Sequence, residues 1–137
     1  MDILLLYPMF LMVLLTFIVA CIAVKARFAS LKNKTVRVKF YSLMNGQEVP
    51  DIVTKTTRNF NNQFEVPVLF YVACSLYIFW GVNSYFALTI AWLFVILRIV
   101  HSCIHLTYNH VLHRMLAFWF SLLCVMGLWI NLLLQKI

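Results

Sequence analysis

The chain has 137 residues, of which 64% are hydrophobic and 11% are charged, and its formal net charge is +7. This composition is too apolar for a soluble domain, and the length leaves room for only one domain. We therefore interpret residues 1–137 as a single membrane domain.

Four apolar runs have about the length that a helix needs to cross a bilayer. They lie at about 3–24, 61–80, 86–106 and 115–134. The connections after the second and third runs are short, so consecutive spans should be antiparallel neighbours. The sequence predicts an all-α fold, namely an integral membrane four-helix bundle with up-down topology.

The first apolar run could be either a cleaved secretion signal or an uncleaved span. A signal peptide begins with basic residues, but here Asp2 precedes the run without any Lys or Arg. The basic residues come after the run instead, at Lys25 and Arg27. This pattern favours an uncleaved first span.

Most of the positive charge lies in the segment 25–60, which holds eight of the eleven Lys and Arg residues. By the positive-inside rule this loop should be cytoplasmic, with both termini on the opposite face. A basic segment of this kind serves as a topology signal and contacts anionic lipids, and no nucleic-acid recognition motif accompanies it. Within it, the alternating stretch TVRVKFY at 35–41 predicts a short strand, and NG at 45–46 predicts a turn.

The second span begins with polar residues. Arg58, Asn62 and Glu65 are spaced i, i+4, i+7, which places them on one face of a helix at its cytoplasmic end. Pro67 cannot donate a backbone hydrogen bond, so it should free a carbonyl about one turn earlier. We therefore expect the helix to be loosened where this polar face begins.

The third span carries a second polar face at the same depth. Its members, spaced i, i+3, i+7 and i+10, are Arg98, His101, His105 and Tyr108. An Arg at the centre of a membrane helix costs roughly 2.5 to 3.5 kcal/mol, so Arg98 should face protein, a partner charge or water. Glu65 is the only acid at that depth, and we predict that it pairs with Arg98.

Two interpretations of these polar faces remain. One is an internal cluster of ion pairs and amides that holds the helices together. The other is a ligand site, because Arg58, Arg98 and Arg114 provide three cations against the single acid Glu65. The uncompensated positive charge favours an anionic ligand.

The four cysteines all fall within predicted spans among apolar neighbours. They are Cys21, Cys74, Cys103 and Cys124. We expect them to be small buried hydrophobic residues, and they imply no disulfide framework.

The polar residues also match a family pattern. Arg58-x-x-x-Asn62-x-x-Glu65 enters the second span, "RIVH" begins at Arg98 in the third, and Arg114 follows sixteen residues after Arg98. This combination resembles the family of membrane-associated proteins in eicosanoid and glutathione metabolism. That family includes microsomal glutathione S-transferases, the membrane prostaglandin E synthase and the five-lipoxygenase-activating protein. The second-span sequence FEVPVLFY, at 64–71, is similar to that of bacterial-type members.

The resemblance implies a homotrimer of four-helix subunits, with glutathione as a cosubstrate bound between subunits near the cytoplasmic face. It implies that Arg114 is the catalytic residue, which stabilises the thiolate. The residues that it implies for holding glutathione are Arg58, Asn62, Glu65, Arg98 and His101. Many members carry a tyrosine seven residues after Arg98; here His105 stands there and Tyr108 follows one turn later, so both join the predicted binding set.

Three functions remain open. The first is a glutathione-dependent membrane transferase or peroxidase that acts on a lipophilic electrophile. The second is a non-catalytic trimer that binds lipid or serves as a scaffold. The third uses His101 and His105 as axial ligands of a haem or metal, but Arg98 lies one turn away and no Cys or carboxylate accompanies them. We therefore predict a glutathione site and no metal site.

Overall fold

A computed structural model describes residues 2–137, and every regular element in this part of the chain is helical. The elements are η1 (Asp2–Leu5), α1 (Leu6–Lys32), α2 (Phe40–Leu43), α3 (Asp51–Asn62), α4 (Val66–Phe79), α5 (Tyr85–Leu106) and α6 (Val111–Leu134). Four helical stretches are long and apolar enough to cross a membrane, at 3–32, 51–79, 85–106 and 111–134. The prediction of an all-α, multi-pass membrane protein is confirmed.

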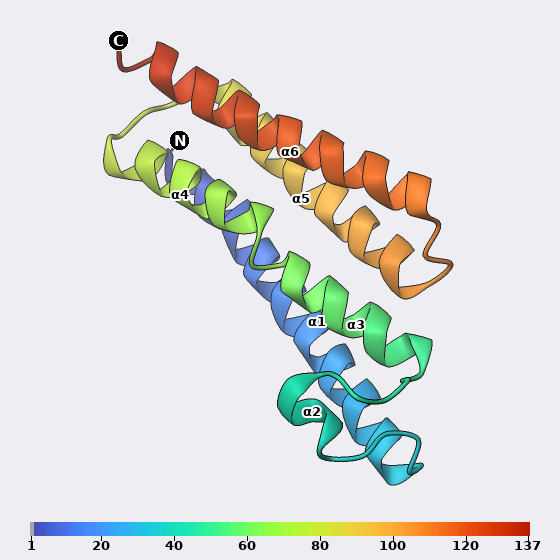
Figure 1. Cartoon of the computed structure of the whole chain (residues 1–137). Helices are drawn as coiled ribbons and strands as arrows, with labels where there is room; N and C mark the ends of the chain where they lie inside the picture. Colours follow the sequence, from blue (N-terminus) through green and yellow to red (C-terminus); the bar gives the residue numbers. More distant parts are fainter. Residues whose placement is uncertain (1) are drawn as a thin grey trace.

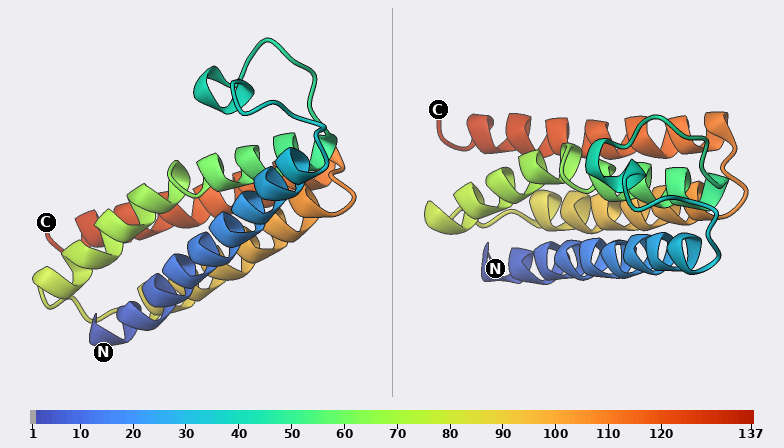
Figure 2. Two further views of the ribbon diagram at one scale, coloured as in Figure 1. Left: turned by 90° about the horizontal axis from the view of Figure 1, so that it is seen from below. Right: turned by 60° about the horizontal axis from the view of Figure 1, so that its bottom comes forward.

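The long helices form a bundle in which α5 and α6 run antiparallel along their length, α1 packs against α3 and α5, and α4 packs against α6 (Figure 1). The apolar core includes Phe70 and Phe94, whose rings stack with centroids 4.4 Å apart. Both termini lie at one end of the bundle, and the basic segment and the α5–α6 turn lie at the other (Figure 2). The second end therefore gathers the polar ends of α3, α5 and α6.

Helix α1 continues past the predicted end of the first span, to Lys32, and α3 begins at Asp51. The connection is therefore 33–50 rather than the predicted 25–60. The reason is that residues 25–32 contain no Gly or Pro, and Lys, Arg and Ala favour a helix in water as well as in lipid. Helix α3 starts directly after Pro50, whose extended backbone conformation cannot continue a helix backwards.

The strand predicted for residues 35–41 is not formed. The end of this stretch belongs to α2 instead, and no strand occurs anywhere in residues 2–137. An isolated strand has no partner for its backbone groups in an all-helical molecule, so the alternation of Val36 and Val38 does not produce a sheet. The predicted turn at 45–46 is present, with Gly46 in the left-handed region at φ +81°.

The second span is broken at residues 63–65, between α3 and α4. Pro67 occupies the first turn of α4, where its missing N–H is tolerated. The predicted loosening at this point is confirmed in a stronger form, because the helix is interrupted rather than merely bent. Before the interruption, α3 packs against α1 and α5, whereas after it α4 packs against α6.

The expectation of four buried cysteines is wrong for two of them. Cys74 and Cys124 are buried, whereas Cys21 and Cys103 are exposed on the surface of the chain, and all four are free. In a membrane protein an apolar setting in the sequence includes side chains that face lipid, so it does not by itself indicate burial.

Candidate functional site

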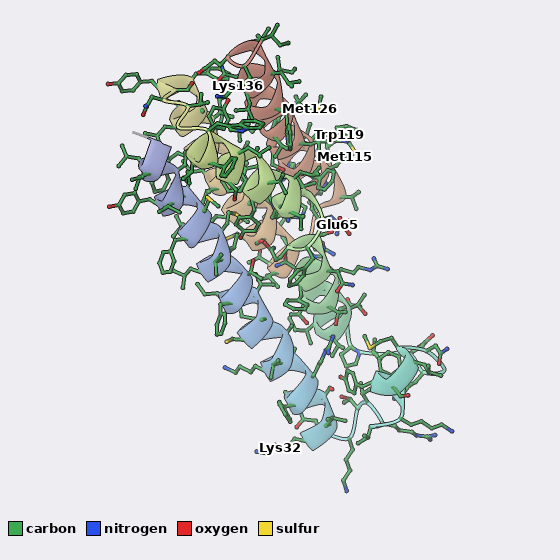
Figure 3. The ribbon with its side chains drawn as sticks, turned by 90° about the vertical axis from the view of Figure 1, so that its left-hand side faces the viewer. Lys32, Glu65, Met115, Trp119, Met126 and Lys136 are labelled. Atoms are coloured by element: carbon green, nitrogen blue, oxygen red, sulfur yellow. The ribbon has the colours of Figure 1, made fainter. Side chains whose placement is uncertain are left out.

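A cavity of about 510 Å³ opens where the end of α3, the end of α5 and the start of α6 meet. The side chains that line it are Arg58, Asn61, Asn62, Glu65, His101, His105, Val111, Arg114, Met115 and Phe118. Six predicted site residues are among them. Figure 3 shows Glu65 at the junction of α3 and α4, on the side where Met115 of α6 lies.

Arg98 lies behind this cavity and is completely buried. Its Nη2 donates a hydrogen bond to the carbonyl oxygen of Asn62 at 2.7 Å. In an uninterrupted helix that carbonyl would accept a backbone hydrogen bond from the next turn, so the break at residues 63–65 makes it available to Arg98. The Nε and Nη1 atoms of Arg98 have no hydrogen-bond partner.

Glu65 and Arg98 make no direct hydrogen bond in the described chain, since Nε and Nη1 of Arg98 have no partner. Glu65 is nevertheless near enough to attract Arg98 electrostatically. The predicted pairing is therefore an attraction at longer range rather than a direct contact. Glu65 lies directly before α4 with an exposed side chain that makes no capping hydrogen bond, while Arg98 is held by the Asn62 carbonyl. The backbone carbonyl was not visible as a partner in the sequence, because only the break exposes it.

His101 and His105 are both buried, one turn apart on α5, with ring centroids 5.9 Å apart. His101 Nδ1 lies 3.1 Å from the carbonyl oxygen of Arg114. A carbonyl can only accept, so Nδ1 carries the hydrogen, and in the neutral form of the ring Nε2 is then an acceptor. That Nε2 and the Nδ1 of His105 are buried without a partner.

Arg114 is anchored at the start of α6 by its neighbour in the α5–α6 turn. Its Nη1 donates to Oδ1 of Asn109 at 2.8 Å. Asn109 adopts a left-handed conformation with φ 49°, which Asn tolerates better than most residues and which lets the chain reverse between the two helices. Sequence reasoning missed Asn109; the signal was an Asn in a short turn between two spans.

Arg58 and Glu65 also line the cavity but are exposed, and neither side chain makes a hydrogen bond or ion pair among the described residues. Together with Arg98 and Arg114 they give the region three guanidinium groups and one carboxylate. The site therefore has a positive excess that nothing in the described subunit neutralises.

A second polar cluster lies behind the end of α3 and was also missed. Ser102 donates to Oδ1 of Asn59 at 3.1 Å, and Gln63 Nε2 lies 3.2 Å from the Ser102 hydroxyl. All three side chains are buried. Asn59 and Gln63 are spaced i, i+4 and directly follow Arg58 and Asn62, so they lie on a face adjoining the predicted one. Their contacts with Ser102 hold the broken span against α5.

Tyr108 does not join the other predicted residues. Helix α5 ends at Leu106, so the helical spacing from Arg98 does not extend to Tyr108. Its side chain is exposed, and its hydroxyl lies 3.1 Å from Nδ1 of His113. Of the two residues predicted to replace the family tyrosine, only His105 lines the cavity.

The residues at the cavity are also relevant to the haem alternative. Among residues 2–137, no three His, Cys, Asp or Glu side chains lie close enough together to hold a metal ion. His101 and His105 both line the cavity, and the charged groups that line it with them are Arg58, Arg114 and Glu65. This donor set suits an anion better than a cation.

Comparison with known families matches residues 5–134 to the MAPEG family. The match spans all four membrane-length helices, including every residue of the cavity. A search of curated proteins finds no match to the chain.

Proposed function

The chain belongs to the MAPEG family, whose members are generally glutathione-dependent membrane enzymes, and on this basis we propose that it binds glutathione in the cavity between α3, α5 and α6. The proposed activity is transfer of glutathione to a lipophilic electrophile, or reduction of a lipid peroxide by glutathione. The observation that carries the proposal is the uncompensated positive charge of Arg58, Arg98 and Arg114 around this cavity.

The side chains at the cavity complement glutathione in charge and in hydrogen-bonding groups. Glutathione carries two carboxylates, one ammonium group and one thiol, so several guanidinium groups and one carboxylate complement it. Glu65 would bind the ammonium group, and Arg58 and Arg98 would bind the carboxylates. The buried Nε2 of His101 adds an acceptor for an N–H or S–H of the ligand.

Arg114 would stabilise the sulfur of glutathione in its ionised form. A thiol with a pKa near 8.5 is only a few per cent ionised at neutral pH, and a cation beside it raises that fraction. In the conjugation reaction the sulfur gives up its proton to solvent, forms a bond to the electrophilic carbon and displaces a leaving group such as chloride. The hydrogen bond from Arg114 to Asn109 orients the guanidinium for this role.

We also propose that three subunits assemble, with the site completed across the subunit boundary. Support comes from Arg58 and Glu65, which are exposed and without partners in one subunit although they line the cavity. A detergent-corrected mass measurement should give a trimer. A monomer that binds glutathione with full affinity would overturn the assembly proposal.

The test of the function is calorimetry of the detergent-solubilised protein with glutathione and with S-methyl glutathione. We expect both to bind, and only glutathione to produce the ultraviolet absorbance of a thiolate. Binding without the thiolate absorbance, or without conjugation of a chloronitrobenzene, would indicate a non-catalytic binding protein. A protein that binds neither compound would contradict the proposal as a whole.

A further inference from the structure

The connection between α1 and α3, residues 33–50, projects from the side of the bundle instead of continuing along its axis (Figure 2). We call residues 33–50 the lateral segment. Its contacts with α1 fix its depth: the Tyr41 hydroxyl lies 2.6 Å from the hydroxyl of Ser30, and the Arg27 guanidinium lies 5.7 Å from the centre of the Tyr41 ring. The lateral segment is therefore held at the level of Arg27 to Ser30.

This level corresponds to the headgroup layer of a bilayer. The apolar part of α1 ends at Val24, and Lys25 is the first cation after it. Helix α1 has 27 residues, so it is about 40 Å long, whereas the hydrocarbon core is about 30 Å thick. Arg27 to Ser30 lie one to two turns beyond the core, and a segment that leaves sideways there runs along the membrane surface.

The exposed side chains of the lateral segment are apolar and basic. Val38 and Leu43 are 76% and 73% exposed, and Phe28 at the adjacent end of α1 is 69% exposed. Lys34, Arg37 and Lys39 are exposed among them, and no acid occurs between residues 25 and 47. Apolar side chains that alternate with cations suit the boundary between acyl chains and charged headgroups.

Arg37 and Lys39 also line a hollow of about 500 Å³, together with Ser42, Leu43 and Asn45. Neither cationic side chain makes a hydrogen bond or ion pair in the described part of the chain. The hollow thus offers two free cations beside hydroxyl and amide groups, which is a suitable environment for a phosphate group.

The lateral segment is ordered rather than a loose linker. The side chain of Gln47 accepts a hydrogen bond from the backbone N–H of Arg37 and donates one to the carbonyl of Thr35. Val36 and Phe40 are buried, which fixes the intervening residues. The basic and apolar side chains are consequently presented together on a preformed surface.

We propose that the lateral segment binds anionic phospholipids of the leaflet on its side of the membrane. The lipid phosphate lies in the hollow between Arg37 and Lys39, and Val38 and Leu43 insert beside the headgroups. This inference does not depend on glutathione binding, because the lateral segment shares no residue with the cavity. A soluble acidic partner fits less well, since exposed apolar side chains at headgroup depth would be covered by lipid.

The experiment is hydrogen–deuterium exchange of the full chain in nanodiscs, either of phosphatidylcholine alone or with about one third phosphatidylglycerol. Peptides from residues 33–50 should exchange at least threefold more slowly in the anionic nanodiscs. Substitution of Arg37→Gln and Lys39→Gln should abolish this difference and leave glutathione binding unchanged. The matched control is Lys32→Gln with Lys136→Gln, which removes the same charge; Figure 3 shows Lys32 on the side of α1 away from α2 and Lys136 at the far end.

The control variant should keep the lipid-dependent protection. Peptides from α6 should exchange alike in all variants, which shows that the bundle is intact. Equal exchange of residues 33–50 in the two kinds of nanodisc would overturn the proposal. An equal loss of protection in the control variant would also overturn it, because the effect would then be one of net charge.

Discussion

The two ends of the bundle both contain polar side chains within membrane-length helices, but they differ in how those side chains are satisfied. At the end that holds the termini, the Tyr77 hydroxyl donates to Oδ1 of Asn131 at 2.7 Å, and the Ser84 hydroxyl and Gln135 Nε2 also lie within hydrogen-bond distance of this oxygen. At the other end, His101 and His105 line a cavity and Arg98 lies behind it, and all three retain buried atoms without partners.

The contrast extends over the whole described chain. All seven buried side-chain nitrogen and oxygen atoms without a partner belong to the end with the basic segment. Buried polar groups are normally hydrogen-bonded, because leaving one unsatisfied costs about 1 to 3 kcal/mol. The Asn131 cluster is complete by itself and holds helices together. At the cavity end, four of the seven unpartnered atoms belong to Arg98, His101 and His105, at or directly behind the cavity, where a ligand could pair with them.

Replacement of Arg98 by Met should have the largest effect and tests whether the cavity end serves ligand binding rather than stability. Arg98→Met removes the buried cation, and glutathione affinity should fall at least about 100-fold, which corresponds to about 2.7 kcal/mol. Stability in the absence of ligand should change little, because Met fills a similar volume and the lost guanidinium had two unpartnered nitrogens. Calorimetry and thermal unfolding of the same preparation measure both. A large loss of stability with unchanged affinity would indicate a structural role.

Replacement of Asn131 by Ala should lower stability without changing glutathione affinity. Its Oδ1 has three side-chain partners, and such bonds in membrane proteins contribute about 0.6 kcal/mol each, so unfolding should become about 2 kcal/mol easier. Glutathione affinity should be unchanged. Titration with a denaturing detergent measures the stability.

A matched control for Asn131→Ala is Ser121→Ala. Ser121 is buried, but its hydroxyl bonds only to the carbonyl of Phe118 in its own helix. Its removal should cost less than that of Asn131, because no contact between helices is lost. If both variants are equally destabilised, the Asn131 cluster does not hold the helices together.

Replacement of Arg114 by Ala should separate thiolate stabilisation from ligand binding. Glutathione affinity should stay within a few fold, because the other site residues still hold the peptide. The thiolate absorbance and the conjugating activity should fall about tenfold or more, which corresponds to about 1.4 kcal/mol in the stability of the charged form. Arg114→Lys should restore only part of the signal, since a point charge replaces a planar fork.

Asn109→Gly provides a related variant, because Gly keeps the left-handed turn but removes the acceptor of the Arg114 guanidinium. Its thiolate signal should lie between those of the original protein and Arg114→Ala. Full thiolate absorbance in Arg114→Ala at saturating glutathione would instead identify Arg114 as a charge that serves topology alone.

The smallest effect is expected for Glu65. Glu65→Gln should weaken glutathione binding about fivefold, because the exposed carboxylate faces the ligand ammonium in partly screened surroundings. Stability should change little, since Glu65 is exposed and only its longer-range attraction to Arg98 would be lost. Asn61→Ala, at an exposed position on the same cavity, is the control. Destabilisation by Glu65→Gln comparable to that of Asn131→Ala would indicate that Glu65 is paired in the assembled protein.

The sequence by itself determined the class of protein and most members of the cavity. Apolar runs of bilayer length can only be helical in lipid, where every backbone group must be satisfied within the segment. The spacing of Arg58 and Asn62 placed them on one face of α3, and both line the cavity. Glu65 lines it too, although it lies in the break after that helix. The spacing of Arg98, His101 and His105 likewise placed three buried residues together on α5.

Only the tertiary structure decided which partners these residues have. The break before Pro67 releases the Asn62 carbonyl to Arg98, and the left-handed Asn109 directs the Arg114 guanidinium. Helical spacing describes side-chain directions within one regular element, so it fails where the helix is interrupted or ends, as at residues 63–65 and at Tyr108. The path of residues 33–50 could not be predicted from the sequence either, because it depends on the contacts of Tyr41 with α1 rather than on local propensity.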